Sequence, residues 1–196
     1  MVEVLGSRKK GLPFIISGPA GTGKTTLVNM LTKDFPCIKE SISFTTRPKR
    51  PEEVSGDHYH FISDEEFEAK IENGDFLEYV QLFDQRYGTS KSWVEKQLNA
   101  GIHVILTIDT QGALYIKEKN LLPAVYIFLS PPSLEELTNR IRERKTETPE
   151  MIAKRLERAK QEMALSEQYD YKIINDDLTV TYEVLKSIFI TEEHKT

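Results

Sequence analysis

The residues Gly18-Pro-Ala-Gly-Thr-Gly-Lys-Thr25 set the architecture of this chain. They fit the pattern G-x-x-x-x-G-K-[ST] in full, and such a loop turns its backbone N–H groups inward around a phosphate. The apolar residues 12–17 before it predict a strand buried on both faces, and residues 24–33 after it carry apolar side chains at helical spacing. Together they predict a nucleoside triphosphate site, which a switch, a motor and a kinase would share.

The rest of the chain continues the alternation of strands and helices. Ser133 and Glu136 form the sequence pattern of a capping box, and Thr148 with Pro149 is typical of a helix start. This order favours parallel strands joined by right-handed crossovers, hence an α/β fold of the P-loop NTPase type with a parallel sheet flanked by helices. Further strands are expected at residues 102–109, 124–129 and 171–175, and helices at about 134–144, 149–166 and 179–191.

The middle of the chain breaks this alternation. Between about residues 41 and 88, short alternating runs of Thr, Tyr, His and Phe surround one helix at 64–73, for which Ser63 and Glu66 form a capping box. We therefore expect a small mixed α+β insertion, partly antiparallel, on one side of the parallel core.

The composition is that of a compact globular protein. The 196 residues suit one domain, and 39% hydrophobic and 29% charged residues lie far from a disordered composition. A net charge of −5 argues against a general grip on nucleic acid or an anionic membrane surface, and no apolar run approaches the roughly 18 residues of a membrane helix. The single cysteine, Cys37, suits a reducing compartment, so we expect a cytoplasmic protein.

Three residues near the expected sheet edge predict how the triphosphate and its metal are held. Lys24 would reach the outer phosphates, and Thr25 can hold Mg²⁺. Asp109 ends a predicted strand at the carboxyl edge of the sheet, where ligands of open α/β sheets bind, so Mg²⁺ or its water shell is its expected partner. A role for Asp109 as the N-cap of the next helix is the alternative, and it does not exclude the first.

Basic residues concentrate in one segment of the chain. Arg140 and Arg144 share a helix face, and Arg155 and Arg158 share another across a short loop. Two such helices predict a lid that closes on the transferred phosphoryl group, neutralises its charge and excludes water. For any single arginine, a solvated ion pair with a nearby glutamate is the alternative. The full set is Arg140, Arg142, Arg144, Lys145, Lys154, Arg155, Arg158 and Lys160.

A second anion site is predicted in Ser43-Phe-Thr-Thr-Arg-Pro-Lys-Arg50, which His58-Tyr-His60 follows. The proline keeps the segment extended, and the first and last arginines can converge as forked donors with tyrosine hydroxyls beside them, which suits a phosphate dianion. The two histidines flank Tyr59 and point away from it on a strand, so structural roles are expected for them.

Seven blocks of residues make the chain recognisable. They are Ser17-Gly-Pro-Ala-Gly-Thr-Gly-Lys-Thr-Thr26, Thr45-Thr-Arg-Pro-Lys-Arg-Pro51, Gly56-Asp-His-Tyr-His-Phe61, Phe76-Leu-Glu-Tyr79, Tyr87-Gly-Thr-Ser90, Ile108-Asp-Thr-Gln-Gly112 and Ile173-Ile-Asn-Asp-Asp177. Colinear over about residues 12–189, they closely resemble guanylate kinase. P-loops are widely shared, whereas the arginine, tyrosine and glutamate blocks in this order are specific to that family.

The resemblance implies an ATP-dependent kinase that phosphorylates GMP and dGMP with Mg²⁺, on a P-loop core with a GMP-binding insertion and a helical arginine lid. Its ATP would lie on Gly18, Pro19, Ala20, Gly21, Thr22, Gly23, Lys24, Thr25, Thr26 and Asn175. Its GMP would lie on Arg47, Arg50, Tyr59 and Tyr87 for the phosphate, on Glu78, Ser43 and Thr89 for guanine, and beside Asp109. The catalytic charges would be Lys24, Arg140, Arg144 and Arg155, and the metal-holding residues Thr25 and Asp109, the latter through water.

The chemistry of guanine supports the role of Glu78 independently. The ring N–H and the exocyclic amine of guanine are two adjacent donors that one carboxylate accepts together. Adenine presents an acceptor at the ring position and would leave Glu78 unpaired.

Two positions depart from the family's pattern. The usual Asp-Ile-Asp before the Gln-Gly begins here with Thr107, so one carboxylate near Lys24 is missing and the orientation of the metal or the lysine is expected to differ. The usual Gly-Arg-Gly of the lid has Glu143 and Lys145 around Arg144, which predicts a stiffer hinge.

Two other functions stay open on the sequence. One is a guanylate-kinase-like module that has lost phosphoryl transfer and binds phosphopeptides, and the other is a related P-loop kinase with a non-guanine substrate. The intact Lys24 and Thr25 argue against the first, and Glu78 argues against the second.

We expect one domain over residues 1–196. Its partners would be the substrates ATP and GMP, with no nucleic acid and no membrane, and the sequence leaves both a monomer and a weak homodimer open. The expected layout is a core at about 12–36, 101–133 and 168–192, an insertion at about 37–90 and a lid at about 137–158.

Overall fold

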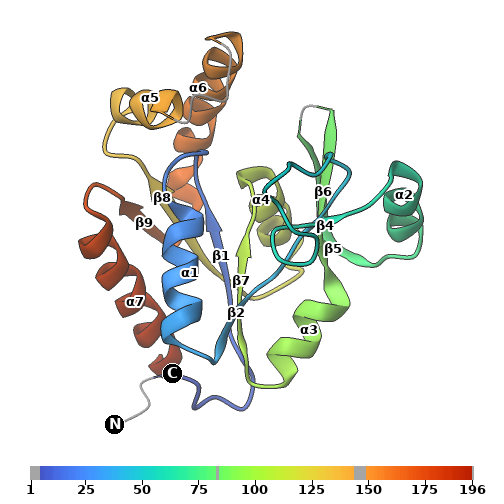
Figure 1. Cartoon of the computed structure of the whole chain (residues 1–196). Helices are drawn as coiled ribbons and strands as arrows, with labels where there is room; N and C mark the ends of the chain where they lie inside the picture. Colours follow the sequence, from blue (N-terminus) through green and yellow to red (C-terminus); the bar gives the residue numbers. More distant parts are fainter. Residues whose placement is uncertain (1–4, 83, 144–148, 196) are drawn as a thin grey trace.

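The main sheet has five parallel strands in the order β2-β7-β1-β8-β9 (Figure 1). The structure is a computed structural model that describes residues 5–82, 84–143 and 149–195, with the backbone alone for Glu143 and Pro149. Apolar runs at 12–17, 102–109, 124–129 and 171–175 predicted four of these strands, and all four are confirmed. The strands are β1 (Pro13–Ser17), β2 (Ile38–Glu40), β7 (His103–Thr107), β8 (Val125–Ser130) and β9 (Tyr171–Ile174).

Helices cover both faces of this sheet, as the alternation of strands and helices predicts. On one face lie α1 (Lys24–Asp34) and α7 (Leu178–His194), and on the other lie α3 (Lys91–Asn99) and α4 (Thr110–Glu118). Successive side chains of β1 alternate between the two faces, so that Phe14 packs with the first pair of helices and Ile15 with the second. Each face therefore has its own apolar core.

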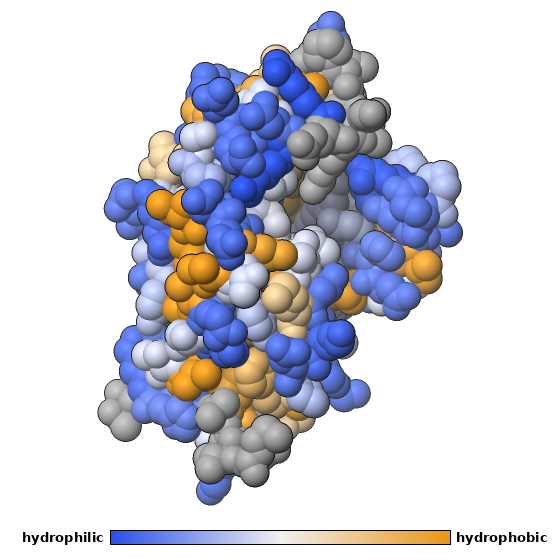
Figure 2. All heavy atoms as spheres, turned by 60° about the vertical axis from the view of Figure 1, so that its left-hand side comes forward, coloured by the Kyte–Doolittle hydropathy of each residue, from blue (hydrophilic) through white to orange (hydrophobic). Residues whose placement is uncertain are grey.

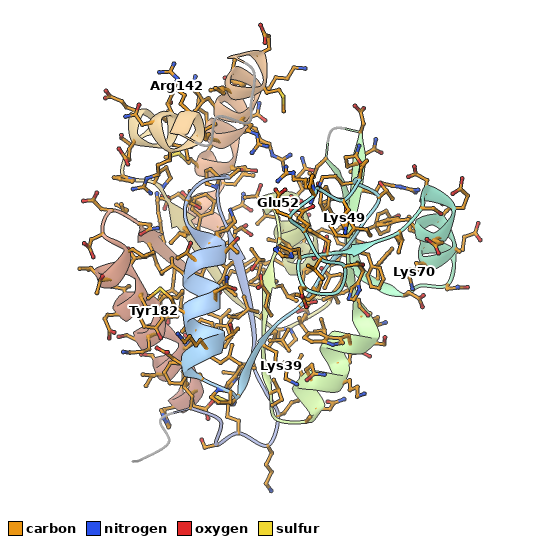
Figure 3. All side chains as sticks on the ribbon, viewed as in Figure 1. Lys39, Lys49, Glu52, Lys70, Arg142 and Tyr182 are labelled. Carbon is orange, nitrogen blue, oxygen red and sulfur yellow. The ribbon has the colours of Figure 1, made fainter. Side chains whose placement is uncertain are left out.

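The last helix, α7, packs on α1 through the side chains expected to face inward. Tyr182, Leu185, Ile188 and Phe189 are all buried. Tyr182, labelled in Figure 3, lies between the two helices, and its hydroxyl donates to Asp34 of α1. The outer side of α7 also carries apolar side chains, which gather on the face shown in Figure 2; they are Leu178, Val180 and Val184, with Ile174 of β9.

The register of the main sheet gathers several chain segments at one edge. Ile16 of β1 pairs with Thr107 of β7, and Ser130 of β8 pairs with Ile174 of β9. The chain therefore leaves β1, β7 and β9 at the same carboxyl edge, which faces upward in Figure 1. This edge receives the glycine loop, Asp109 and Asn175, in the place where open α/β sheets bind ligands.

A second sheet of four strands lies to one side of the first (Figure 1). Its order is β4-β3-β6-β5, with β3 and β4 parallel and the other pairs antiparallel. Helix α2 (Asp64–Glu72) packs on it through the fully buried Phe67 and starts at the expected capping box of Ser63 and Glu66. The strands are β3 (Phe44–Thr45), β4 (His60–Phe61), β5 (Phe76–Leu82) and β6 (Gln85–Ser90).

Two further helices stand above the carboxyl edge of the main sheet in Figure 1. They are α5 (Leu134–Glu143) and α6 (Pro149–Ala164), and they pack together through Leu137, Ile141 and Ala159. A short 3₁₀ helix, η1 (Ser166–Gln168), follows α6. Among the described residues, no helix combines the length and the apolar character that crossing a membrane requires.

Several local expectations need correction. Helix α3 was not predicted from the sequence. Residues 38–40 were expected in the insertion, but they pair with β7 as an edge strand of the main sheet. Helix α6 ends two residues early. Helix α7 runs three residues past its expected end, where Glu192 and Glu193 are buried and accept hydrogen bonds from Tyr171 and Ser7. Ser133 Oγ accepts the N–H of Glu136 as a cap should, but the carboxylate of Glu136 binds Arg140 instead of closing the box. The expected cap at Thr148 lies outside the described residues.

Candidate active site

The glycine loop after β1 is shaped by close backbone packing. Gly18 has φ of 146°, and a Cβ on it would lie 2.1 Å from the carbonyl oxygen of Leu129. Gly23 is left-handed with φ of 88° and precedes α1, whose first turn has no side-chain cap. Only glycine suits the first position, and the N–H groups that open α1 are directed to whatever lies in the loop. The loop therefore has the form of a phosphate cradle.

Lys24 lies folded into this loop. Its Nζ donates to the carbonyl oxygens of Gly18 at 2.6 Å and Pro19 at 3.0 Å. The ammonium therefore already points into the cradle, where phosphate oxygens would compete with these carbonyls. Thr25 and Thr26 are exposed beside it, and Thr22 is buried with its hydroxyl bonded to the carbonyl of Pro19.

Asn175 joins the glycine loop to α5. Its Nδ2 donates to the carbonyl of Thr22 at 2.8 Å, and its own carbonyl accepts from the guanidinium of Arg140 at 3.1 Å. Arg140 also donates to Glu136 at 2.9 Å. The structure thus connects Arg140, an expected charge of the lid, to the glycine loop through Asn175, which was expected beside ATP.

Asp109 caps α4, which was one of its two expected roles. Its Oδ1 accepts the N–H groups of Gln111 at 2.6 Å and Gly112 at 3.3 Å. Burial raises the pKa of this carboxyl, against the lowering effect of these N–H groups and of the charge on Arg158. The cap uses Oδ1 and leaves the role of metal partner to Oδ2, so the two roles remain compatible.

Glu78 is a buried carboxylate on β5, only 3% exposed. Thr89 of β6 donates its hydroxyl to Oε1 at 2.6 Å. The other oxygen lies against α4, where a Cβ on Gly112 would come within 2.5 Å of Oε2. Burial raises the pKa of Glu78 to about 7, against the bond from Thr89, and the charge of Asp109 adds to the rise. Glu78 and Thr89 are thus together, as expected for a guanine site.

The expected phosphate residues of the second sheet form an aromatic and charged cluster. The guanidinium of Arg47 lies 5.3 Å from the ring centre of Tyr59, which meets the ring of Tyr87 at 5.8 Å. Glu53 accepts from Arg47 Nη2 at 2.6 Å and from the backbone N–H of Arg50 at 2.8 Å. The bond from Arg47 is the main reason that the pKa of Glu53 falls to about 2, with the Arg50 N–H adding to it.

The remaining expected site residues have fewer contacts with the residues described so far. Arg50 is exposed, on the loop that carries Lys49 and Glu52 in Figure 3. Its backbone N–H binds Glu53, and its charge adds to the lowering of the Glu53 pKa. Ser43 is half-buried, and its carbonyl accepts the N–H of His60. Arg155 is half-buried on α6, and Arg144 lies outside the described residues.

Both histidines of this region stay with the second sheet. His58 Nδ1 accepts the N–H of Val54, and the ring of His60 packs on Phe44 at 4.7 Å. These contacts fit the structural roles expected for them.

Three residues of the site escaped the sequence analysis. Glu53 holds Arg47, yet nothing in the sequence separates it from the exposed Glu52 before it. Gly112 lies against Glu78 although α4 and β5 are distant in the chain. Glu40 accepts a 2.8 Å bond from the hydroxyl of Thr107, so a carboxylate stands beside the position where the expected one is missing. The signal that could have identified Glu40 is the pairing of residues 38–40 with β7, which places Glu40 near Thr107.

The oxygen donors at the sheet edge suit Mg²⁺ shared with a nucleotide. Among the described residues, no group of three or more His, Cys, Asp or Glu side chains forms a metal site. Mg²⁺ usually keeps several waters and takes one or two carboxylates with the substrate phosphates. Asp109 with the hydroxyl of Thr25 matches that donor set, which is hard oxygen throughout.

The parallel sheet with helices on both faces and the glycine loop with Lys24 at its carboxyl edge define the class of P-loop phosphotransferases. The family model described as guanylate kinase matches residues 10–192. The chain belongs to the guanylate kinase family.

Individual relatives agree with this assignment. A guanylate kinase of Protochlamydia amoebophila is 57% identical over 190 residues, which cover 97% of this chain and 95% of the relative. One of Chlamydia felis is 50% identical over 93% of this chain and 89% of its own. The crystal structure of guanylate kinase from Anaplasma phagocytophilum matches with a TM-score of 0.80 at 33% identity, covering 95% of this chain and 88% of that one.

Proposed function

We propose that this protein transfers the γ-phosphoryl group of ATP to GMP, and to dGMP, giving ADP and the nucleoside diphosphate. The observation that carries the proposal is the buried carboxylate of Glu78, held by Thr89 in the same sheet as the Arg47 cluster. A carboxylate acceptor at one end and arginine and tyrosine donors at the other match guanine and a phosphate of one nucleotide. The family membership independently supports ATP-dependent phosphotransfer.

On the ATP side, the glycine loop and Lys24 would bind the triphosphate. The loop N–H groups and the start of α1 would hold the phosphates, and the ammonium of Lys24 would exchange its carbonyl partners for phosphate oxygens. Thr25 and Asp109 would hold Mg²⁺, Asp109 through water. When bound, this ion offsets negative charge on the phosphates.

On the GMP side, Glu53 prepares the phosphate site. Arg47 gives one guanidinium nitrogen to Glu53 and another to the carbonyl of Pro48, which fixes the plane of the fork. The remaining N–H groups of Arg47 and the hydroxyls of Tyr59 and Tyr87 would bind the phosphate. At the other end, Glu78 would accept both guanine donors, since Oε1 has a second lone pair beyond its bond to Thr89 and Oε2 has no bond to Thr89.

Phosphoryl transfer needs no protein nucleophile here. Both substrates are anionic, so the protein would neutralise repulsion and align the GMP phosphate oxygen with the γ-phosphoryl group. We assign that charge to Lys24, Arg140, Arg144 and Arg155. The arginine helices α5 and α6 would act as the lid and the second sheet as the GMP-binding insertion, both approaching the core when nucleotides bind. The proposal includes a cytoplasmic location, which a single cysteine, Cys37, outside any disulfide suits.

A coupled assay of ADP formation tests this function. With GMP, AMP, UMP and CMP at equal concentration, we expect turnover with GMP to exceed the others by about 10² or more, because a site built for two donors leaves buried groups unpaired with the wrong base. Similar rates with all four would contradict guanine recognition. Binding of both ATP and GMP without any ADP formed would instead indicate a binding module.

A further inference from the structure

A second carboxylate, besides Asp109, reaches the carboxyl edge of the main sheet. Glu40 is the last residue of β2, and the register pairs it with Ile105 of β7, two residues before Thr107. Its side chain extends along β7 far enough for Oε1 to accept the hydroxyl of Thr107 at 2.8 Å. Thr107 in turn pairs with Ile16 of β1, two residues before Gly18. Glu40 therefore ends beside the start of the glycine loop, on the strand next to that of Asp109.

The surroundings of Glu40 also extend toward the GMP half. The negative charge on Glu40 is one of the causes that raise the pKa of the Tyr59 hydroxyl, after burial and the charges of Tyr87 and Glu53. The chain also passes from Glu40 into β3 within four residues, and Phe44 of β3 pairs with His60, the neighbour of Tyr59. Two anionic phosphates would have to meet in this region, and a bare carboxylate there would repel both.

A purely structural role explains Glu40 poorly. Burial raises the pKa of its carboxyl, which shows that the charged form is disfavoured, and the single bond from Thr107 only partly offsets this. A threonine at a strand end can be satisfied by water, so the bond does not require a carboxylate. A cation held with the substrate phosphates is the partner that would favour a charged carboxylate here.

We propose that Glu40, oriented by Thr107, is a positioning residue for that cation and would accept hydrogen bonds from the water shell of Mg²⁺. The inference rests on the proposed function, since it needs two phosphates at this edge. It also accounts for Thr107: the carboxylate that the family pattern has on β7 is supplied here from the neighbouring strand β2.

The test compares metal binding with nucleotide binding. The variant Glu40→Gln keeps the size of the side chain and the acceptor for Thr107 but removes the charge. In the complex with GMP and an unreactive ATP analogue, we measure Mn²⁺ affinity by the electron paramagnetic resonance of free Mn²⁺. We expect about tenfold weaker Mn²⁺ binding, because a charge-assisted bond to a metal water is lost. Without metal, calorimetry should show unchanged or tighter GMP binding, since a negative charge near the phosphate is gone.

A matched control and a rescue complete the design. Glu192 also accepts a hydroxyl, from Tyr171 at 2.6 Å, but on α7 away from the site, so Glu192→Gln should leave Mn²⁺ affinity unchanged. The double variant Glu40→Gln/Thr107→Asp returns a carboxylate to β7, with the new amide able to donate to it, and should recover Mn²⁺ affinity to within about threefold of the parent.

Two results would overturn the proposal. One is Mn²⁺ affinity in Glu40→Gln within twofold of the parent, and the other is metal-free GMP binding that weakens as much as Mn²⁺ binding does. Both affinities are measured on Glu40→Gln alone, so the test does not depend on whether the double variant folds. Turnover of the parent with GMP is measured separately, and its absence would refute the proposed function whatever Glu40 does.

Discussion

The two halves of the proposed site, one for ATP and one for GMP, are built by different means. On the ATP half, the loop between β1 and α1 consists of backbone shaped by glycines, and its one charged side chain, Lys24, rests on the loop's own carbonyls. On the GMP half, the groups are side chains that already have partners: Arg47 holds Glu53, and Thr89 holds Glu78. One half is a cradle of N–H groups, and the other is a set of paired side chains.

This difference follows from what each half must recognise. A chain of phosphates is repetitive and anionic, so a row of N–H groups at a helix start serves any nucleoside triphosphate. Guanine is told from adenine only by donors and acceptors on one edge, which needs a particular side chain in a fixed orientation. The pairs in the second sheet supply that orientation before the ligand arrives, so changes in each half should have different signatures.

Loss of the loop lysine should have the largest effect. We expect Lys24→Ala to lower turnover by about 10³-fold or more, because a charge aimed at the transferred group is removed, while the affinity for GMP stays within about twofold. A coupled assay gives turnover, and calorimetry gives GMP affinity. Arg47→Ala serves as the opposite control, with GMP affinity lost. Equal loss of GMP affinity in both variants would mean that the two halves are not separate.

Loss of the buried carboxylate should change specificity. In Glu78→Ala, kcat/KM for GMP should fall by very roughly one to three orders of magnitude, because guanine donors lose their acceptor at a cost of about 1–3 kcal/mol or more. The rate with AMP should stay constant or rise, since adenine no longer faces a carboxylate. Thermal melting checks folding, and Glu78→Gln, which keeps an acceptor for Thr89, separates charge from packing. Proportional losses for GMP and AMP would remove Glu78 from the guanine site.

A methyl group added at Gly112 should weaken GMP binding by displacing the carboxylate of Glu78. In Gly112→Ala the new Cβ would lie 2.5 Å from Oε2 of Glu78, so the carboxylate must move. We expect GMP affinity to fall about tenfold, roughly 1.4 kcal/mol, with the affinity for an ATP analogue unchanged. Helix propensity favours alanine over glycine, so the melting temperature should not drop. Gln111→Ala, an exposed neighbour on α4, is the control; unchanged GMP affinity in Gly112→Ala would refute the contact.

The smallest expected effect is a pH dependence confined to the GMP half. Glu78 has a pKa of about 7 in the folded protein, and its ionised form is the one that accepts two guanine donors. Between pH 8 and pH 6.5, GMP affinity should therefore weaken about fourfold, as the ionised fraction falls. Calorimetry on the parent and on Glu78→Gln isolates this effect from titration of the GMP phosphate itself. Identical slopes in the two proteins would contradict it.

Glu78 should also make the free energy of unfolding depend on pH when no ligand is bound. Since the pKa of Glu78 is raised from 4.5 to about 7, the folded state binds its proton more tightly than the unfolded state does. The free energy of unfolding therefore falls as pH rises through that window, on account of this residue. In Glu78→Gln this contribution should be absent, which denaturant titrations at pH 5 and pH 7.5 can measure.

The elements that the sequence predicted correctly are those with long, local signals. Four strands of the main sheet are continuous apolar runs, and the capping box of Ser63 and Glu66 predicts the start of α2. Helix α3 was missed because it starts directly after β6, with Ser90 serving both as the end of the strand and as the N-cap. Strand β2 was missed because three residues at a sheet edge carry too little pattern.

The site divides in the same way. The glycine loop is contiguous, so its residues could be found from spacing alone. Glu78 looks like an ordinary strand carboxylate until a family resemblance singles it out, because its burial depends on α4, which lies elsewhere in the chain. Glu53 and Glu40 have no local signal at all, since each is defined by a partner across a strand or loop.

The order of strands in the main sheet also bears on how the chain folds as it is synthesised. The central strand β1 is the first to leave the ribosome, but its neighbours are β7 and β8; the bond from Leu12 to His103 already spans 91 residues. The second sheet closes far shorter loops, with Thr89 and Glu78 only 11 residues apart. Short loops close at lower entropic cost and sooner. We therefore expect the β5–β6 hairpin to form before β1, the strand that precedes the glycine loop, pairs with β7 and β8.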